Sequence, residues 1–470
     1  MLKSLIRRTG HINQGALPLS RGHRSLSTNF SVPLIINGQQ VHTSESFPVT
    51  SPLTNKEIWS FSCAKDEHIQ KAVQSAHTSS RRDIFLKAAD TMDRRRAELG
   101  EYMHHEISAN KFYQDFILRV TIEGLRDTAG RIAGAITAMV HKKPYGVVLR
   151  IAPWNAPYNL GLRSVLFALA TGNTTILKGS EYIPRCYWAI YDVLREAGLP
   201  DGYLNLLFHS PAEAASTIDS LVSHLLVKKI NFTGSTGVGR IISATAGKHL
   251  KPILMELGGK ASAIVLKDAD LEQAARHCVQ GAFLNAGQIC MSTERIIVHE
   301  SIASEFQDLL SHVIRKNFGT AYDTPAVVTS ASASRNRDLI SDAISKGAYQ
   351  VKIFGDEYAH ETETKIRPVV LGNSFGPSVS LFIFQTHREA LDLANDIEYG
   401  LTASIFSKDL KAAFDLANDL ESGAVHINSM TVHDESSLPH GGVKDSGFGR
   451  FNGSQGLDEF LYYKTVTWME

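Results

Sequence analysis

The chain has few cysteines and no excess of charge of either sign. Its 470 residues include four cysteines, 48 basic and 48 acidic residues, so the formal net charge is zero. A balanced charge gives no electrostatic footprint for binding nucleic acid or an anionic membrane. There is no CxxC pair and no HExxH motif, so we expect neither a disulfide framework nor a bound metal. No apolar run reaches the length that spans a membrane.

Acidic residues are also absent from the start of the chain, where the first one is Glu45. Residues 1–28 are rich in Arg and Ser, and this composition is typical of a mitochondrial presequence. A tail with an accidental bias is the alternative, and the protein would then be cytoplasmic. We predict mitochondrial targeting and leave residues 1–28 out of the fold prediction.

The chain as a whole is 43% hydrophobic, which is enough for a large core and for two domains. From residue 146 onward, short apolar runs such as YGVVLRIAP and TTILKG alternate with segments of helical periodicity. This alternation predicts an α/β fold with a doubly wound parallel sheet. The alternation repeats after residue 260, so we expect a second α/β unit. Cys278 falls on the apolar face of a helix predicted over residues 269–285, which makes it a core residue.

A glycine-rich turn, NFTGSTGVGR, lies between a predicted strand and a predicted helix. Gly234 and Gly239 allow a tight backbone turn, while the Ser235 hydroxyl and the N–H groups at the helix start suit a phosphate. The turn is not the GxGxxG fingerprint, and an ordinary strand–helix turn is an equally good interpretation of this stretch alone.

Lys178 and Glu181 follow another predicted strand, in the stretch LKGSE. Ligands of open α/β sheets bind at this end of the strands. A carboxylate there can accept hydrogen bonds from both hydroxyls of an adenosine ribose, which favours NAD over NADP. The alternative is a surface Lys–Glu pair.

Two further strand ends carry candidate catalytic groups. In APWNAP, prolines stiffen the loop around Trp154 and Asn155, and a rigidly held amide is a good donor to an oxyanion. Most Asn residues near Pro are simply turn residues. In MELGGK, Glu256 follows an apolar strand, so we expect burial to raise its pKa and make it a general base.

The stretch NAGQICMST places Cys290 on a loop after the helix predicted over residues 269–285. A single loop cysteine is more often an inert thiol than a nucleophile. However, Asn155, the ribose contact, the glycine-rich turn, Glu256 and Cys290 follow one another along the chain, and together they could supply an oxyanion donor, a ribose contact, a phosphate site, a base and a nucleophile.

These stretches, together with EYGLTASIF and GGVKDSGFGR, resemble the signatures of the NAD(P)-dependent aldehyde dehydrogenase superfamily from about residue 34 onward. The wording of GVVLRIAPWNAPYNLGLRS is similar to the branch that acts on aromatic aldehydes such as salicylaldehyde and vanillin. The resemblance implies an NAD-binding domain over 29–257, a catalytic domain over 258–450 and a C-terminal oligomerisation segment over 451–470. It also implies a homodimer or homotetramer, with no nucleic-acid or membrane partner.

The resemblance further implies a mechanism. The Cys290 thiolate attacks the aldehyde carbon, the Asn155 amide and a backbone N–H hold the oxyanion, and hydride transfer to NAD leaves a thioester. Glu256 then activates water to release the acid. The resemblance adds cofactor contacts to those already named, and the full set of predicted contacts is Ile151, Trp154, Lys178, Glu181, Gly234, Ser235, Gly239, Leu257 and Phe375.

The sequence departs from the family pattern at three places. Asn373 stands where relatives carry a Glu before FGP, which contacts the nicotinamide ribose. The connector around AHTSSRRD is short, and so is the stretch around residues 130–145, where relatives build an oligomerisation hairpin. These departures leave two alternatives open: an impaired homologue with a binding or scaffold role, and a thioester or ester hydrolase without hydride transfer.

Overall fold

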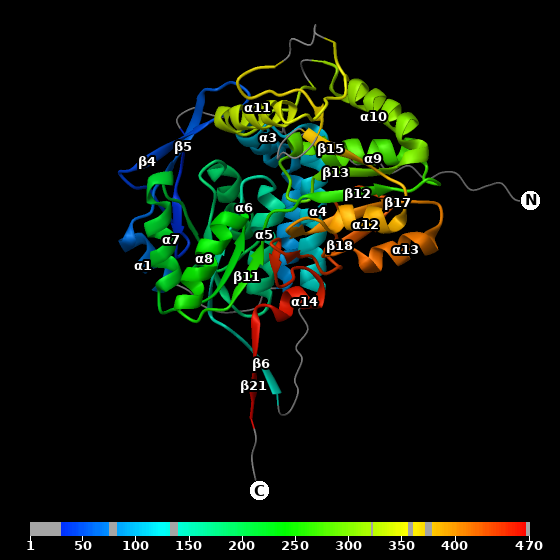
Figure 1. Ribbon diagram of the computed structural model, residues 1–470. Helices are drawn as coiled ribbons and strands as arrows, with labels where there is room; N and C mark the ends of the chain where they lie inside the picture. The colour runs from blue at the N-terminus through cyan, green and yellow to red at the C-terminus, as the bar shows by residue number, and fades with distance from the viewer. Residues whose placement is uncertain are drawn as a thin grey trace, which may run out of the picture.

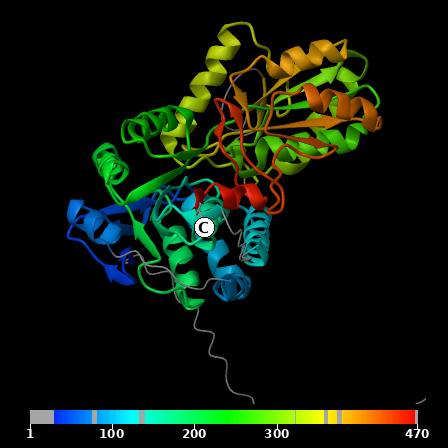
Figure 2. The same cartoon turned by 90° about the horizontal axis from the view of Figure 1, so that it is seen from below.

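Two large α/β sheets dominate the molecule, as the strand–helix alternation predicts (Figure 1). The computed structural model describes residues 30–74, 82–131, 140–320, 323–355, 361–371 and 378–466. Seen from below, the blue-to-cyan segments and the yellow-to-orange segments form two lobes, with the red C-terminal segments between them (Figure 2).

The first sheet contains a parallel centre with antiparallel strands at its edges. Its order is β20 (Gly447–Phe448), β11 (Ile253–Glu256), β10 (Val227–Thr233), β7 (Val147–Ile151), β8 (Thr174–Lys178), β9 (Leu204–Leu207), β2 (Leu34–Ile36) and β3 (Gln39–Val41). From β7 the chain builds outward through β8 and β9, and then returns to add β10 and β11 on the other side. The carboxyl ends of β7 and β10 therefore flank a topological switch point, where open α/β sheets bind ligands.

Several helices between residues 66 and 248 are associated with the first sheet. They are α1 (Asp66–Gln74), α2 (Arg82–Arg94), α3 (Arg96–Ile107), α4 (Lys111–Arg131), α5 (Pro157–Ala170), α6 (Pro184–Glu196), α7 (Ala214–Ser223) and α8 (Thr236–Lys248), with the 3-10 turn η1 (Pro211–Glu213) before α7.

One prediction in this region was only partly right. Taken alone, the run Arg94–Arg96 predicts a solvated helix face, and Arg94 and Arg96 are 60% and 37% exposed, but Arg95 separates α2 from α3 and its side chain is only 16% exposed. Its guanidinium pairs with Asp192 at 2.9 Å and with Glu98 at 2.9 Å. Those carboxylates compensate its burial, and Asp192 lies nearly 100 residues away, so the local pattern could not reveal the pair.

The second sheet is parallel throughout its described strands. Its order is β14 (Val369–Val370), β15 (Ser378–Phe384), β13 (Thr293–His299), β12 (Ala261–Val265), β17 (Thr402–Phe406) and β18 (Ala424–Ile427). The associated helices are α9 (Leu271–Phe283), α10 (Ala303–Phe318), α11 (Ser330–Ser345), α12 (His387–Asn395) and α13 (Leu410–Asp419), with 3-10 turns η2 (Leu284–Gly287) and η3 (Glu300–Ile302). Cys278 is 1% exposed on α9, which confirms it as a core residue.

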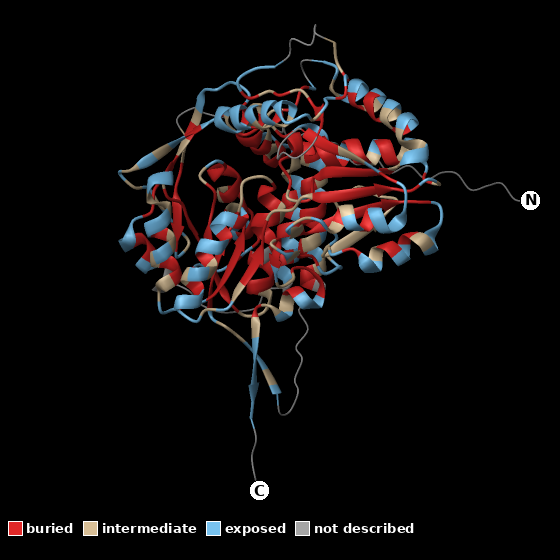
Figure 3. Ribbon diagram, in the orientation of Figure 1, coloured by how far each residue is buried: buried red, intermediate tan, exposed pale blue. Residues whose placement is uncertain are grey.

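Smaller sheets complete the fold. They join β1 (Ser31–Val32) and β4 (Ser46–Thr50) to β5 (Glu57–Ser62), β16 (Tyr399–Gly400) to β19 (Val443–Lys444), and β6 (Val140–Pro144) to β21 (Leu461–Thr465), while α14 (Gly453–Asp458) precedes β21. The antiparallel β6–β21 pair projects from the body of the molecule as a largely exposed ribbon (Figures 1 and 3). It occupies part of the region where the sequence predicts a shortened hairpin.

Burial follows the strands (Figure 3). Every residue of β7, β8, β12 and β17 is buried, because helices cover both faces of a doubly wound sheet. This explains the continuous apolar runs that predicted these strands.

Candidate active site

A cleft of about 630 Å³ lies at the carboxyl ends of β7 and β10. Its volume is in the usual range of small-molecule sites. Its lining brings together six predicted residues from four separate parts of the sequence: Trp154, Asn155, Gly234, Ser235, Leu257 and Cys290. The sheet topology therefore places the glycine-rich turn and the cysteine loop on one cavity.

The glycine-rich turn leads directly from β10 into α8. Ser235 is the N-cap of α8 and has extended backbone angles, but its side chain makes no capping hydrogen bond. The first N–H groups of the helix therefore face the cleft with a free hydroxyl beside them, an arrangement that suits a phosphate. A Cβ at Gly239 would lie 2.6 Å from Leu257 Cδ2, so only glycine lets α8 pack this closely on the strand end. These features fit a dinucleotide cofactor.

Lys178 and Glu181 lie beside the cleft without lining it. Their side chains pair at 3.6 Å, and burial lowers the pKa of Lys178 although Glu181 opposes this. Glu181 lines an adjoining cavity of about 250 Å³ together with Tyr182. The Tyr182 ring contacts the Trp154 ring of the cleft edge-on, with centroids 6.4 Å apart. The two cavities are thus neighbours.

The remaining predicted cofactor contacts have different positions. Ile151 ends β7 and is 6% exposed, so it supports the floor below the Trp154 loop. Phe375, and Asn373 with it, lie outside the described residues. The short connector predicted around AHTSSRRD falls mostly on residues 75–81, which are also outside them.

The Asn155 loop is held from two sides. Its Nδ2 donates to the Gln288 carbonyl at 2.8 Å, and its own carbonyl accepts from the Tyr113 hydroxyl at 2.9 Å. An amide nitrogen carries two hydrogens, so one remains for a ligand. This rigid loop is consistent with an oxyanion donor.

Cys290 follows an unusual piece of backbone. In η2, Asn285 and Ala286 have left-handed φ values of 51° and 57°, which end α9 and turn the chain back toward the cleft. Burial raises the pKa of the Cys290 thiol well above its usual range, and the nearby Glu256 charge adds to this, while Arg163 opposes it. The thiol is therefore protonated at neutral pH, and its reaction requires a proton acceptor.

Glu256 ends β11 and is 1% exposed, as its apolar neighbours predict. Its Oε2 pairs with the Arg163 guanidinium, and its Oε1 lies 3.1 Å from His440 Nε2. The Thr233 hydroxyl donates to Oε2 at 3.3 Å.

The predicted direction of the Glu256 pKa shift was wrong. Burial alone does raise this pKa, but the Arg163 charge and the His440 hydrogen bond outweigh burial and lower it well below its usual range. Arg163 lies 93 residues away in the sequence, so burial was the only term that the local pattern could reveal. The arginine and histidine contacts of Glu256 therefore favour its ionised form.

A second, narrow cavity connects the catalytic candidates. It has a volume of about 20 Å³, and Asn155, Glu256 and Cys290 all line it. Sequence reasoning missed two of its lining residues, Arg163 and Asp434, whose side chains pair at 2.9 Å. The stretch GLRSVLF offered one signal, because a charged residue on an otherwise apolar helix is usually paired when it is buried.

A second ion pair that the sequence analysis missed lines the large cleft. Lys260 Nζ lies 2.7 Å from Glu294 Oε2. Burial raises the pKa of Glu294 to about 7, although Lys260 opposes this shift. Glu294 lies four residues after the cysteine, so this pair brings a titratable group close to Cys290.

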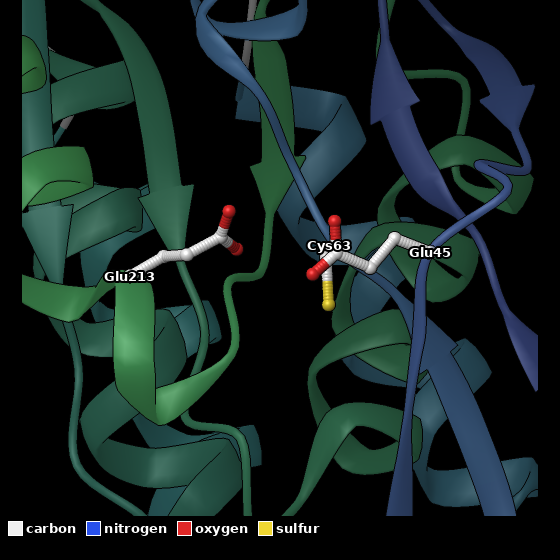
Figure 4. A group of neighbouring side chains, drawn as sticks. All are labelled: Glu45, Cys63 and Glu213. Carbon is white, nitrogen blue, oxygen red and sulfur yellow. The ribbon is translucent and has the colours of Figure 1, made fainter.

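Within the described residues, one group has the spacing of metal ligands: Glu45, Cys63 and Glu213 (Figure 4). Burial and the two carboxylates raise the pKa of Cys63 to about 11, and Lys65 already pairs with Glu45 at 3.4 Å. A thiol must lose its proton to bind a metal, so this environment disfavours a site and we assign no metal role to it.

Comparison with known proteins decides the family. The model of the aldehyde dehydrogenase family matches residues 40–466. The chain belongs to the aldehyde dehydrogenase family. It is an NAD(P)-dependent oxidoreductase that converts an aldehyde to the carboxylic acid, and its cofactor is NAD, with NADP as the alternative.

Individual aldehyde dehydrogenases are similar over nearly the whole chain. A vanillin dehydrogenase of Pseudomonas fluorescens is 38% identical, with 93% of this chain and 97% of the relative covered. The solved salicylaldehyde dehydrogenase of Pseudomonas putida G7, in complex with salicylaldehyde, has a TM-score of 0.86 at 32% identity, covering 93% and 97% of the two chains. Betaine aldehyde dehydrogenase of Staphylococcus aureus, solved with NAD+, has a TM-score of 0.85 at 27% identity, covering 93% and 94%.

The family fold agrees with the predicted one, a cofactor-binding α/β unit followed by a catalytic α/β unit. In the described part of the chain, none of the helices combines the length and the apolar character needed to cross a membrane.

Proposed function

We propose that this aldehyde dehydrogenase oxidises aromatic aldehydes with NAD+, using Cys290 as nucleophile, Asn155 as oxyanion donor and Glu256 as base. One observation carries the residue roles. These three side chains line one narrow cavity, and Asn155 and Cys290 also line the large cleft beside the glycine-rich turn. A substrate on one side of Cys290 and a cofactor on the other would meet at the sulfur atom.

The first step needs an acceptor for the thiol proton, because burial keeps Cys290 protonated. Glu256 lines the same cavity as Cys290 and is the acceptor that this geometry offers. Sγ then bonds to the aldehyde carbon, and the Asn155 amide and the Cys290 backbone N–H stabilise the oxyanion. A bound NAD+ would supply the hydride acceptor, and a thioester would then remain on Cys290. Glu256 passes the thiol proton to solvent and next removes a proton from water, and hydrolysis releases the acid.

The cofactor contacts are proposed from the cleft. Ser235 and the first N–H groups of α8 hold the pyrophosphate, while Trp154 and Leu257 form the walls. Val238 and Ile241, one turn apart on α8, are 47% and 68% exposed although apolar, so the adenine ring packs on them. Ile151 supports the floor, and Gly239 keeps α8 close to Leu257.

Glu181 decides between NAD and NADP. Its carboxylate accepts the ribose hydroxyls and repels a 2′-phosphate, and Lys178 at 3.6 Å fixes its position. We expect Glu181→Ser to lower kcat/KM with NAD+ and to raise it with NADP+. An unchanged NAD+/NADP+ ratio would remove Glu181 from this role.

The substrate class rests on the named relatives and on the cavity. The relatives act on vanillin and salicylaldehyde, and α4 contributes Tyr113 and Phe116 to the wall of the narrow cavity. Its volume of about 20 Å³ suits one water molecule, so an aromatic ring enters only when wall side chains such as Phe116 shift.

The decisive experiment measures NADH formation over a panel of aromatic and aliphatic aldehydes. We expect aromatic aldehydes to have the highest kcat/KM and Cys290→Ala to abolish NADH formation. Ester hydrolysis is measured in parallel, because hydrolysis without NADH would favour a hydrolase. NADH formation by Cys290→Ala would remove the assigned nucleophile.

Larger-scale proposals follow from the sequence. We assign residues 29–257 to NAD binding, 258–450 to catalysis and 451–470 to oligomerisation; β20 crosses this division, because it joins the first sheet. A homodimer or homotetramer is proposed, through the β6–β21 ribbon.

We also propose that residues 1–28 direct the protein to mitochondria. This proposal rests on composition alone, because the relatives named above are bacterial and offer no support for it. Cell fractionation with N-terminal sequencing tests this.

A further inference from the structure

The base of the proposed mechanism is held by an arginine that has a second carboxylate partner. The Arg163 NH2 group pairs with Glu256, while its NH1 group lies 2.9 Å from Asp434 Oδ2. All three side chains are at most 4% exposed. One buried cation is therefore divided between two buried anions, in a region where charge interactions are strong.

Asp434 is itself firmly positioned. Asn159 Nδ2 donates to its Oδ2 at 2.9 Å, and Asn452 Nδ2 donates to its Oδ1 at 2.8 Å. Arg163 also lies over the Phe451 ring, 4.5 Å from the centroid, which fixes the guanidinium plane. Asp434 is therefore held in place to pair with the Arg163 guanidinium.

Without Asp434, both Arg163 nitrogens would be available to Glu256. Arginine prefers two parallel hydrogen bonds to one carboxylate, and this bidentate pair is the stronger arrangement. It would occupy both Glu256 oxygens and displace the contact that Oε1 makes with His440. It would also make Glu256 a weaker base, because protonation of the carboxylate would disrupt both hydrogen bonds to Arg163.

We propose that Asp434 is a positioning residue for thioester hydrolysis, which holds Arg163 in a one-point contact with Glu256 and leaves that carboxylate able to accept a proton from water. The inference rests on the proposed role of Glu256. The narrow cavity supports it, because Asp434, Glu256 and Cys290 line a space that holds about one water molecule.

The hydrolytic step balances with the residues present. The water oxygen bonds to the acyl carbon while one water proton passes to Glu256. The carbon–sulfur bond then breaks, and its electron pair goes to Cys290 Sγ, which regains a proton from Glu256. The products are the carboxylic acid and the free thiol.

Other polar and titratable groups also face Glu256 and must be kept constant in the test. His440 approaches Oε1, and Arg150 on β7 donates to the Thr233 hydroxyl that in turn donates to Oε2. The Cys290 thiol lies across the narrow cavity. Asp434→Asn leaves all of these side chains in place.

The test is rapid-mixing kinetics of Asp434→Asn with an aromatic aldehyde and NAD+. We expect a burst of about one NADH per active site, followed by a steady-state rate at least about tenfold below wild type, because acylation survives and hydrolysis slows. Asp434→Glu keeps the charge and should restore the steady-state rate. A loss of burst and steady state in equal proportion would overturn the proposal.

Asp192→Asn is the matched control, because it makes the same change in another largely buried arginine pair, with Arg95, away from the cavity. Its ratio of burst to steady state should equal that of wild type. If Asp434→Asn does not fold, the wild-type pH profile decides, since an ionised Glu256 predicts a hydrolysis rate that is flat from about pH 5 to 8. A decrease in rate centred near pH 7 would overturn the proposal. Absence of any NADH from wild type would instead refute the proposed function.

Discussion

At the scale of single residues, Cys290 combines a half-buried position on the cleft with a thiol that is difficult to ionise. Burial is the larger cause and the Glu256 charge the next, and both raise the thiol pKa. Replacing Glu256 by Gln removes the second cause, and a decrease of one pKa unit gives about tenfold more thiolate. We therefore expect Glu256→Gln to be alkylated by iodoacetamide at pH 8 about tenfold faster than wild type, without cofactor.

Cys290→Ala gives the background from the other cysteines, which are buried. Slower alkylation of Glu256→Gln would mean that Glu256 already removes the thiol proton in the free enzyme.

The residue types of the site could be predicted, but their electrostatics could not. Cys290, Glu256 and Asn155 follow strand ends or a helix end, and local pattern reveals such positions. The shift of the Glu256 pKa depends on Arg163 and His440, which lie 93 and 184 residues away. Burial raises the Glu256 pKa and neighbouring positive charge lowers it, so the direction of the shift depends on which effect is larger. Only the fold determines which charges lie nearby.

At the scale of elements, Glu106 joins two helices. It lies on α3, is 1% exposed, and accepts hydrogen bonds from the backbone N–H groups of Arg185 and Cys186 at the start of α6 and from Trp59 Nε1. Burial raises its pKa to about 7. The pKa of Glu106 is higher in the folded than in the unfolded protein, so burial of the protonated carboxyl contributes to the free energy of unfolding. This contribution is complete below about pH 4.5 and is lost as pH rises through 7.

Urea unfolding at pH 5 and pH 8 measures this effect. We expect the wild-type free energy of unfolding to fall by about 2–4 kcal/mol more than that of Glu106→Gln, in which this group does not titrate. Glu123→Gln, on the exposed face of α4, serves as the control and should match wild type. Parallel curves for wild type and Glu106→Gln would contradict the buried pKa shift.

The contact between α8 and the end of β11 depends on a glycine. Valine at position 239 would collide with Leu257, and overpacking of this kind typically costs 1–3 kcal/mol. We expect Gly239→Val to raise the KM for NAD+ about tenfold or more, because Leu257 and the helix start form the cleft. Gly247→Val is the matched control at the other end of the same helix, because nothing lies within 4 Å of the added Cβ. Equal KM values for the two variants would contradict a role for this packing.

Helices and strands with strong periodicity could be predicted to within a few residues, as with β7, β8 and α9. Their interruptions could not. The boundary between α2 and α3 falls at Arg95, whose partners Asp192 and Glu196 belong to α6. Long-range ion pairs fix such a boundary, and hydrophobic periodicity carries no information about them.

At the scale of the whole molecule, the order of strands and helices in the sequence predicts an α/β fold with two units. It does not predict that the chain returns from the second sheet to the first. Residues 447–448 form β20 and pair with β11 of the first sheet, although they follow the second sheet in sequence. A two-residue strand is too short to give a periodic signal. The domain division predicted from the sequence therefore separates β20 from the sheet to which it belongs.

The β6–β21 ribbon provides the last prediction. Within the described residues each of its strands pairs only with the other, so both outer edges are open, and Tyr463 and Val466 are 60% and 39% exposed. Open edges with apolar side chains invite pairing with another chain. We expect the wild type to sediment as a homodimer or homotetramer and the double variant Tyr463→Asp, Val466→Asp to sediment as smaller species. Tyr349→Asp, at an equally exposed tyrosine (65%) outside the ribbon, should leave the oligomer intact. An unchanged sedimentation coefficient for the double variant would place the interface elsewhere.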